Sequence, residues 1–152
     1  MMTPLILAAA LVVGTPAPVD SALLAGLPMH DVTLTAHGTT QICNGPAFAA
    51  VLAKLGLPQG ESLRGPALAA GVIVRARDGY AVLFSLGEVD ASLGNSGAIL
   101  ATLCGGKPLT EQDGPFRLIV PNENRPARSV RQVTTIELVG GAATPARHPD
   151  AH

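Results

Sequence analysis

The stretch GVIVRARDGYAVLFS, residues 71–85, constrains the fold more than any other part of the chain. Two apolar runs flank Asp78 and Gly79, a pair that is among the strongest local signals for a β-hairpin turn. We therefore predict an antiparallel hairpin over residues 72–85. Tyr80, the only tyrosine in a chain without tryptophan, follows the turn directly. It is a candidate catalytic residue that would donate a hydrogen bond to a substrate, or it is a large side chain on a strand.

The sequence before this hairpin predicts two further strands and one helix. Residues 32–36 alternate apolar and polar side chains, and TQIC at 40–43 is predicted to return as a second strand. The stretch NGPAFAAVLAKLGLP, residues 44–58, predicts a helix that Asn44 caps. Its apolar side chains recur at helical spacing and indicate packing against a core, at Phe48, Val51, Leu52 and Leu55.

The sequence after the hairpin predicts mostly strands. LGEVDASLG indicates a single helical turn, in which Glu88 and Asp90 are expected to cap a helix or meet solvent, not to act as paired carboxylates. Strands are predicted in PFRLIVP and RQVTTIELV, and in GAILATLCGG, for which a helix is the alternative. Many strands with few short helices predict an α+β domain, built as a compact mixed sheet or a sandwich-like arrangement.

The chain of 152 residues is expected to form one domain, over residues 30–139. Residues 1–22 match a signal peptide, because the apolar run at 5–13 is followed by small residues and is too short for a membrane anchor. The alternative is a buried strand or helix of the fold. Residues 140–152 are predicted to be a disordered tail. Export would place the protein in the periplasm or outside the cell, and a net charge of −1 gives no steering toward nucleic acid.

The two cysteines, Cys43 and Cys104, leave their state open. A disulfide is compatible with export, but nothing in the sequence places them close together, so two buried thiols are favoured. The four histidines show no metal-ligand spacing.

Basic residues gather in one segment. Arg125, Arg128 and Arg131 fall within seven residues between two predicted strands, and Arg117 precedes them on a strand. Such a loop suits an oxyanion or a phosphate, because guanidinium groups bind these through paired charge-assisted hydrogen bonds. The alternative is a solvated surface with ion pairs to nearby acidic residues.

The stretch GKPLTEQDGPFRLIVPNENRPARSVRQVTTIEL resembles the C-terminal part of the oxidoreductase molybdopterin-binding domain family, which has the sulfite oxidase-like fold. The helix stretch and ARDGYAVLFSLGEVD are similar to segments of small exported members and occur in the same order. The resemblance covers about residues 32–139 and rests on the matching positions Gly106, Pro108, Leu109, Gly114, Pro115, Arg117, Leu118, Val120, Pro121, Ala127, Arg128, Val130 and Arg131.

The resemblance implies a pterin cofactor that carries molybdenum and a phosphate group. Arg128 and Arg131, with Ser129 between them, match the basic segment that contacts the cofactor or an anionic substrate, and Arg125 precedes it. Catalytic members also supply a cysteine thiolate to the metal, upstream of the helix. Residues 32–42 contain no cysteine, so Cys43 is the only candidate for this catalytic ligand.

Two functions follow from this pattern. The first is an exported molybdopterin-dependent oxidoreductase, with Cys43 as the metal ligand, working with a redox partner protein. The second is a non-catalytic domain of the same fold that binds a small anion or a partner. The sequence leaves open whether the chain is an enzyme, and it gives no substrate, redox partner or oligomeric state.

Overall fold

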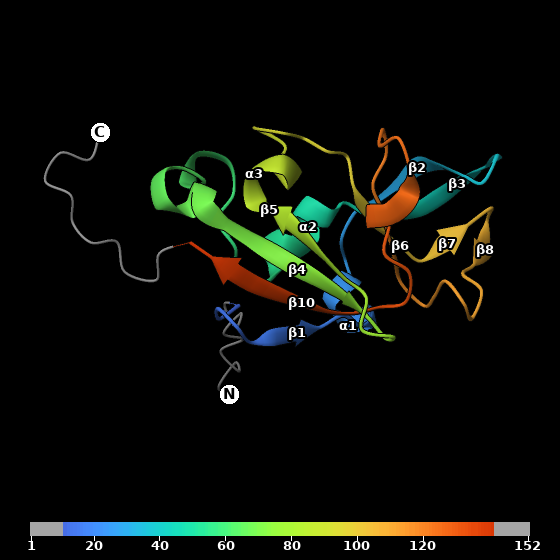
Figure 1. The fold of residues 1–152 in the computed structure, drawn as a ribbon, viewed down its shortest axis with the longest axis horizontal. Coiled ribbons are helices and arrows are strands. Elements are labelled where there is room, and N and C mark those ends of the chain that lie inside the picture. Colours follow the sequence, from blue (N-terminus) through green and yellow to red (C-terminus); the bar gives the residue numbers. More distant parts are fainter. Residues whose placement is uncertain (1–10, 142–152) are drawn as a thin grey trace, which may run out of the picture.

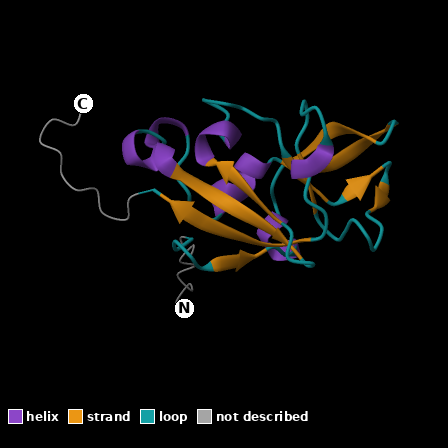
Figure 2. Ribbon diagram, in the orientation of Figure 1, coloured by secondary structure: helices purple, strands orange, loops and turns teal. Residues whose placement is uncertain are grey.

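The computed structural model describes residues 11–141, which form an α+β domain of mostly antiparallel sheets with few short helices (Figures 1 and 2). This confirms the predicted fold class; the relation to the sulfite oxidase-like fold stays a prediction. No helix within the described residues is long and apolar enough to cross a membrane.

One four-stranded antiparallel sheet has the order β1-β10-β4-β5, with strands Pro16–Pro18, Val133–Gly140, Ala70–Ala76 and Ala81–Ser85. The β4–β5 hairpin is the predicted one: Val74 pairs with Val82, and Gly79 in the turn has a φ of 91°. The turn geometry requires this positive φ, which explains the glycine. β10 pairs along the whole of β4, so the last predicted strand closes onto the hairpin.

A second four-stranded sheet has the order β2-β3-β7-β8, with strands Met29–Ala36, Thr39–Pro46, Leu103–Cys104 and Lys107–Pro108. A third sheet is the pair β6, Ile99–Ala101, and β9, Arg117–Ile119. GAILATLCGG therefore forms strands, not a helix. In Figure 1 the long strands β4 and β10 lie at one end of the domain, and β2, β3, β7 and β8 lie at the other.

Short helices complete the domain: α1 at Ser21–Leu24, α2 at Phe48–Lys54 and α3 at Leu86–Val89. Three 3₁₀ turns accompany them: η1 at Gly60–Ser62, η2 at Gly65–Ala69 and η3 at Pro126–Arg128. α2 buries the predicted apolar stripe. The prediction that Asn44 caps this helix is wrong, because Asn44 lies in β3 and its side-chain amide donates to Asp31 Oδ1 at 2.8 Å. Strand pairing with β2 continues through Pro46 and overrides the local capping signal.

The β6–β9 pair separates two buried clusters. Leu100 and Leu118 belong to the main core, which also includes the α2 stripe and the inner side chains of β4 and β10. Ile99 and Ile119 belong to a smaller cluster with Cys43 under β2 and β3. Because side chains alternate along a strand, a short run that is apolar throughout can serve two cores at once.

The preference for two buried thiols is wrong. Cys43 on β3 and Cys104 on β7 are register partners, and their sulfur atoms form a disulfide with an S–S distance of 2.05 Å. Cys43 is fully buried. A disulfide of this kind is typical of proteins from oxidising compartments.

The fold extends beyond the predicted domain limits. β1 pairs with β10, and Val19 and Leu24 are buried in the main core. Cleavage after residue 22 would remove β1 from the mature protein. The sequence of the mature N-terminus therefore distinguishes a cleaved signal peptide from the alternative, in which this segment is a strand of the fold. Residues 1–10 of the predicted signal peptide and residues 142–152 of the predicted tail lie outside the described residues.

Candidate functional site

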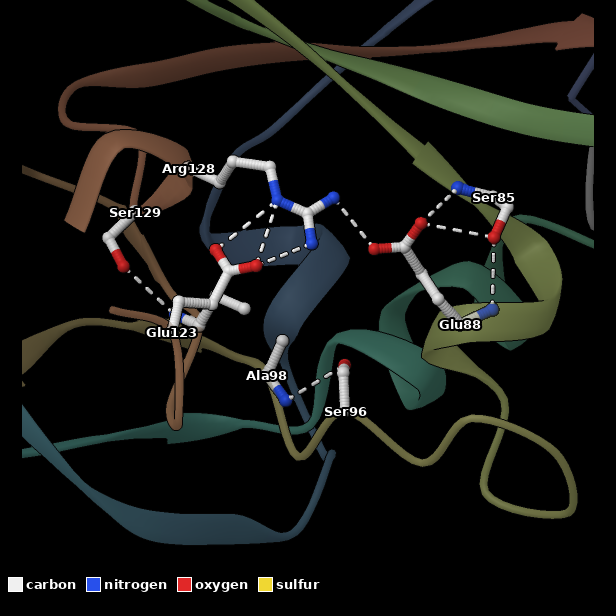
Figure 3. Close-up of polar contacts among 8 residues, drawn as sticks. Ser85, Glu88, Ser96, Ala98, Glu123, Arg128 and Ser129 are labelled. Carbon is white, nitrogen blue, oxygen red and sulfur yellow. Dashed lines mark hydrogen bonds and ion pairs between the residues drawn. The ribbon is translucent and has the colours of Figure 1, made fainter. Parts of the chain in front are cut away.

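Arg128 is the most connected of the predicted binding residues (Figure 3). Its Nη1 donates to Glu88 Oε1 at 2.7 Å, and its Nη2 donates to Glu123 Oε2 at 2.6 Å. Its Nε adds bonds of 3.1–3.2 Å to both Glu123 oxygens. The guanidinium carbon also lies 4.8 Å from the centre of the Phe84 ring. The hydrogen bonds that Arg128 donates to Glu123, and to a lesser extent the one to Glu88, raise the pKa of Arg128 above its usual value.

Ser129 is buried and makes an internal bond as well: its hydroxyl oxygen accepts a hydrogen bond from the Val120 N–H at 3.0 Å. This bond fixes the loop after β9 against η3. Arg128 and Ser129 therefore have structural partners within the protein, and the alternative of ion pairs to nearby acidic residues holds for Arg128.

The arginine segment nevertheless borders a cavity of about 530 Å³. It lies where the β4–β5 turn, the β2–β3 turn, the start of β9 and η3 meet. Of the predicted cofactor-binding residues, Arg125, Ser129 and Arg131 line it and Arg128 does not. The described lining residues are His37, Ala76, Asp78, Tyr80, Gln112, Arg117, Arg125, Pro126, Ala127, Ser129, Val130, Arg131 and Gln132.

Arg117 is the buried charge of this cavity. It opens β9, and its side chain is 4% exposed. Its Nε donates to the Ser129 carbonyl at a long 3.4 Å, and its Nη1 lies 3.8 Å from Asp113 Oδ2. Among the described residues no other partner binds its terminal nitrogens, and no fully buried side-chain nitrogen or oxygen atom lacks a partner. The unpaired N–H groups of Arg117 therefore reach open space, which here is the cavity.

Burial lowers the pKa of Arg117, an effect that Asp113 opposes and Arg131 adds to. Because a guanidinium is not deprotonated in proteins at neutral pH, Arg117 still carries its charge there. A buried cation with spare donors costs free energy unless an anion completes its coordination.

Arg131 and Arg125 extend the positive charge toward solvent. Arg131 Nε lies 3.2 Å from Asp113 Oδ1, so one carboxylate lies between Arg117 and Arg131. Arg125 makes no ion pair within residues 11–141. The structure thus brings Arg117, Arg125 and Arg131 to one cavity and separates them from Arg128.

Tyr80 lines the same cavity, but its hydroxyl donates to the Ala127 carbonyl at 2.5 Å. This bond ties the turn of the β4–β5 hairpin to η3. Tyr80 is therefore a wall of the cavity, and its proton is engaged with the backbone.

Cys43 does not fit the role of a metal ligand. Its sulfur is bonded to Cys104 and fully buried in the smaller core, whereas a metal ligand must be a free thiolate. No group of three potential metal-binding side chains gathers within the described residues. The residues of this chain do not provide the thiolate that the molybdenum centre of the family requires.

Glu88 caps a helix, as the sequence indicated, whereas Asp90 neither caps α3 with its side chain nor meets solvent. Glu88 accepts from the Ser85 N–H at 3.0 Å and completes a capping box on α3. Asp90 is buried and accepts from the Gly60 N–H at 3.0 Å and from the hydroxyl of Ser92.

Sequence reasoning did not assign Arg117, His37, Gln112 or Gln132 to the site. For Arg117 a signal was present, because a lone arginine inside the apolar run PFRLIVP must either leave the core or find a buried partner. For the other three the tertiary contacts between distant turns are needed.

The chain matches no protein-family model, and the comparison with curated proteins found no significant match.

Proposed function

We propose that this protein is an exported, non-catalytic domain that binds a small anion in the cavity of Arg117, Arg125 and Arg131. A relation to the sulfite oxidase-like molybdopterin-binding fold is part of this proposal, supported by three family-like segments in the same order. The observation that carries the anion site is Arg117: a buried guanidinium with unpaired donors that face a cavity.

The disulfide supports the non-catalytic form of the proposal, because it removes the single candidate for the metal thiolate. It also supports export, since such bonds persist mainly in oxidising compartments.

The test is a titration of the isotope-labelled protein with benzoate, sulfate and phosphate at low salt, followed by NMR. At least one anion is expected to shift the amides of Tyr80, Val130 and Arg131. Arg131→Ala should weaken binding by about 10-fold or more, because a charge-assisted hydrogen bond contributes about 1.5–3 kcal/mol. Arg117→Met keeps the length of the side chain, removes its charge and should abolish binding.

Arg64→Ala is the matched control, because Arg64 is exposed and lies outside the cavity. It should leave the affinity unchanged. Equal affinities for the wild type and Arg117→Met, or no shift with any anion, would contradict the anion site. Molybdenum near one equivalent in protein purified from cells that make the cofactor would contradict the non-catalytic assignment.

A further inference from the structure

We infer, on the basis of the proposed anion site, that its ligand has a singly charged carboxylate head group and not a doubly charged phosphate monoester. The inference rests on the charges around the cavity, on the fixed position of Arg117 and on the apolar part of the lining.

The charge balance of the cavity favours one negative charge. Three guanidinium groups line it, and Asp78 lines it as well. Asp113 lies behind Arg117 and Arg131 and neutralises part of their charge. The three arginines and the two aspartates together leave one net positive charge for the ligand. A carboxylate balances this charge, whereas a phosphate dianion would leave an excess negative charge next to Asp113, in a partly desolvated place where uncompensated charge is costly.

The buried guanidinium provides a fixed receptor for such a head group. Arg117 is held on one edge by the Ser129 carbonyl and on another by Asp113, so its remaining N–H groups have a set direction. Guanidinium presents parallel N–H donors that match the two oxygens of a carboxylate. A phosphate can also use such a fork, so the charge, more than the shape, discriminates between the two.

The rest of the lining indicates an apolar body behind the head group. Ala76, Pro126, Ala127 and Val130 contribute aliphatic surface, and the ring of Tyr80 stands beside Ala127 with its hydroxyl engaged. A volume of about 530 Å³ is in the usual range for small-molecule sites. An aromatic or branched carboxylic acid, free or as the C-terminus of a peptide, has this combination of groups.

The experiment compares benzoate, phenyl phosphate and neutral benzamide by calorimetry at about pH 7.5, where a phosphate monoester is mostly a dianion because its second pKa is about 6. Benzoate is expected to bind at least about 10-fold more tightly than phenyl phosphate, a difference of about 1.4 kcal/mol. Benzamide should not bind. An N-acetylated dipeptide ending in phenylalanine, with its C-terminal amide as control, distinguishes a peptide C-terminus from a small free acid. Tighter binding of the free-acid peptide than of benzoate assigns the site to peptide C-termini, and weaker binding assigns it to small acids.

Asp113→Asn tests the charge argument directly. It removes one negative charge behind the two arginines and should improve phenyl phosphate relative to benzoate by about 5-fold or more. The thermal unfolding of this variant, checked first, establishes that it is folded. Phenyl phosphate binding as tightly as benzoate to the wild type, or an unchanged ratio in Asp113→Asn, overturns the inference and leaves the anion site standing. No binding of either anion overturns both.

Discussion

Arg128→Ala should destabilise the fold because Arg128 connects three parts of the chain. It binds Glu88 on α3 and Glu123 in the loop after β9 (Figure 3), and its guanidinium also contacts the ring of Phe84 on β5. Removal of the guanidinium leaves Glu88 with its bonds to Ser85, so that carboxylate keeps partners. Glu123 loses its arginine partner, and the loop loses its attachment to α3.

The magnitude follows from the exposure of the partners. The side chains of Arg128 and Glu88 are 36% and 34% exposed and that of Glu123 is 27% exposed, so solvent screens both ion pairs. We assign each pair about 1 kcal/mol, the upper end of the range for surface pairs, because the Glu123 pair is bidentate. The contact with Phe84 adds about 0.5–1 kcal/mol. Loss of all three lowers the free energy of unfolding by about 2.5–3 kcal/mol, which for a domain of this size corresponds to a fall in Tm of roughly 7–12 °C.

The assay is urea denaturation followed by circular dichroism, for wild type, Arg128→Ala, Glu123→Gln and the double variant. The coupling free energy between Arg128 and Glu123 should be about 1 kcal/mol and should fall at high salt. Arg64→Ala, which removes an exposed arginine elsewhere, should change the stability by less than about 0.5 kcal/mol. Arg128→Ala within about 0.5 kcal/mol of the wild type, or a coupling of zero, would refute the reasoning.

Three further predictions concern stability. Burial acts to raise the pKa of Glu88, but hydrogen bonds from Ser85 and Arg128 hold it below its usual 4.5, so the unfolded chain takes up the proton first as the pH falls. The free energy of unfolding should therefore decline through and below about pH 4.5, with a shallower slope in Glu88→Gln. Urea denaturation between about pH 3 and 6 measures both slopes. The joint replacement of Cys43 and Cys104 by serine should lower the free energy of unfolding by about 4 kcal/mol, because the disulfide closes a loop with a sequence separation of 61; a loss below about 1 kcal/mol in chemical denaturation would contradict this. Gly45→Ala should destabilise the fold by more than about 3 kcal/mol or prevent folding, since the new Cβ would meet a backbone oxygen of β6 at 2.1 Å. The control Gly38→Ala, where nothing lies within 4 Å, should cost only about 1 kcal/mol of backbone strain. Equal changes in Tm for the two variants would argue against the close approach at Gly45.

The sequence predicted the features that local chemistry determines. The turn at Asp78 and Gly79 and the apolar stripe of α2 depend on neighbours within a few residues, and both were correctly placed. Asn44 was misassigned because its capping signal competes with pairing to β2, a contact between segments that the local pattern does not contain. The disulfide was missed for the same reason: Cys43 and Cys104 become neighbours only when β7 pairs with β3.

The division of roles among the arginines also could not be predicted from spacing. A helical turn would direct Arg128 and Arg131 to one side, and both were expected to bind the same anion. The structure has a 3₁₀ turn that ends at Arg128, after which the chain bends at Ser129, Arg131 and Gln132 before β10 begins. Arg128 then faces Glu88 and Phe84, whereas Arg131 faces Asp113 and the cavity.

Residues 76–90 contact η3 at both ends of β5. At the start of this strand, Tyr80 binds the carbonyl of Ala127 in η3. At its far end, Phe84 and Glu88 bind the side chain of Arg128, the last residue of the same turn. One short hairpin strand thus positions η3 from two sides, and η3 in turn supplies part of the cavity wall. Since η3 depends on these contacts, a change at Phe84 or Glu88 should alter the anion site through its geometry, although neither residue lines the cavity.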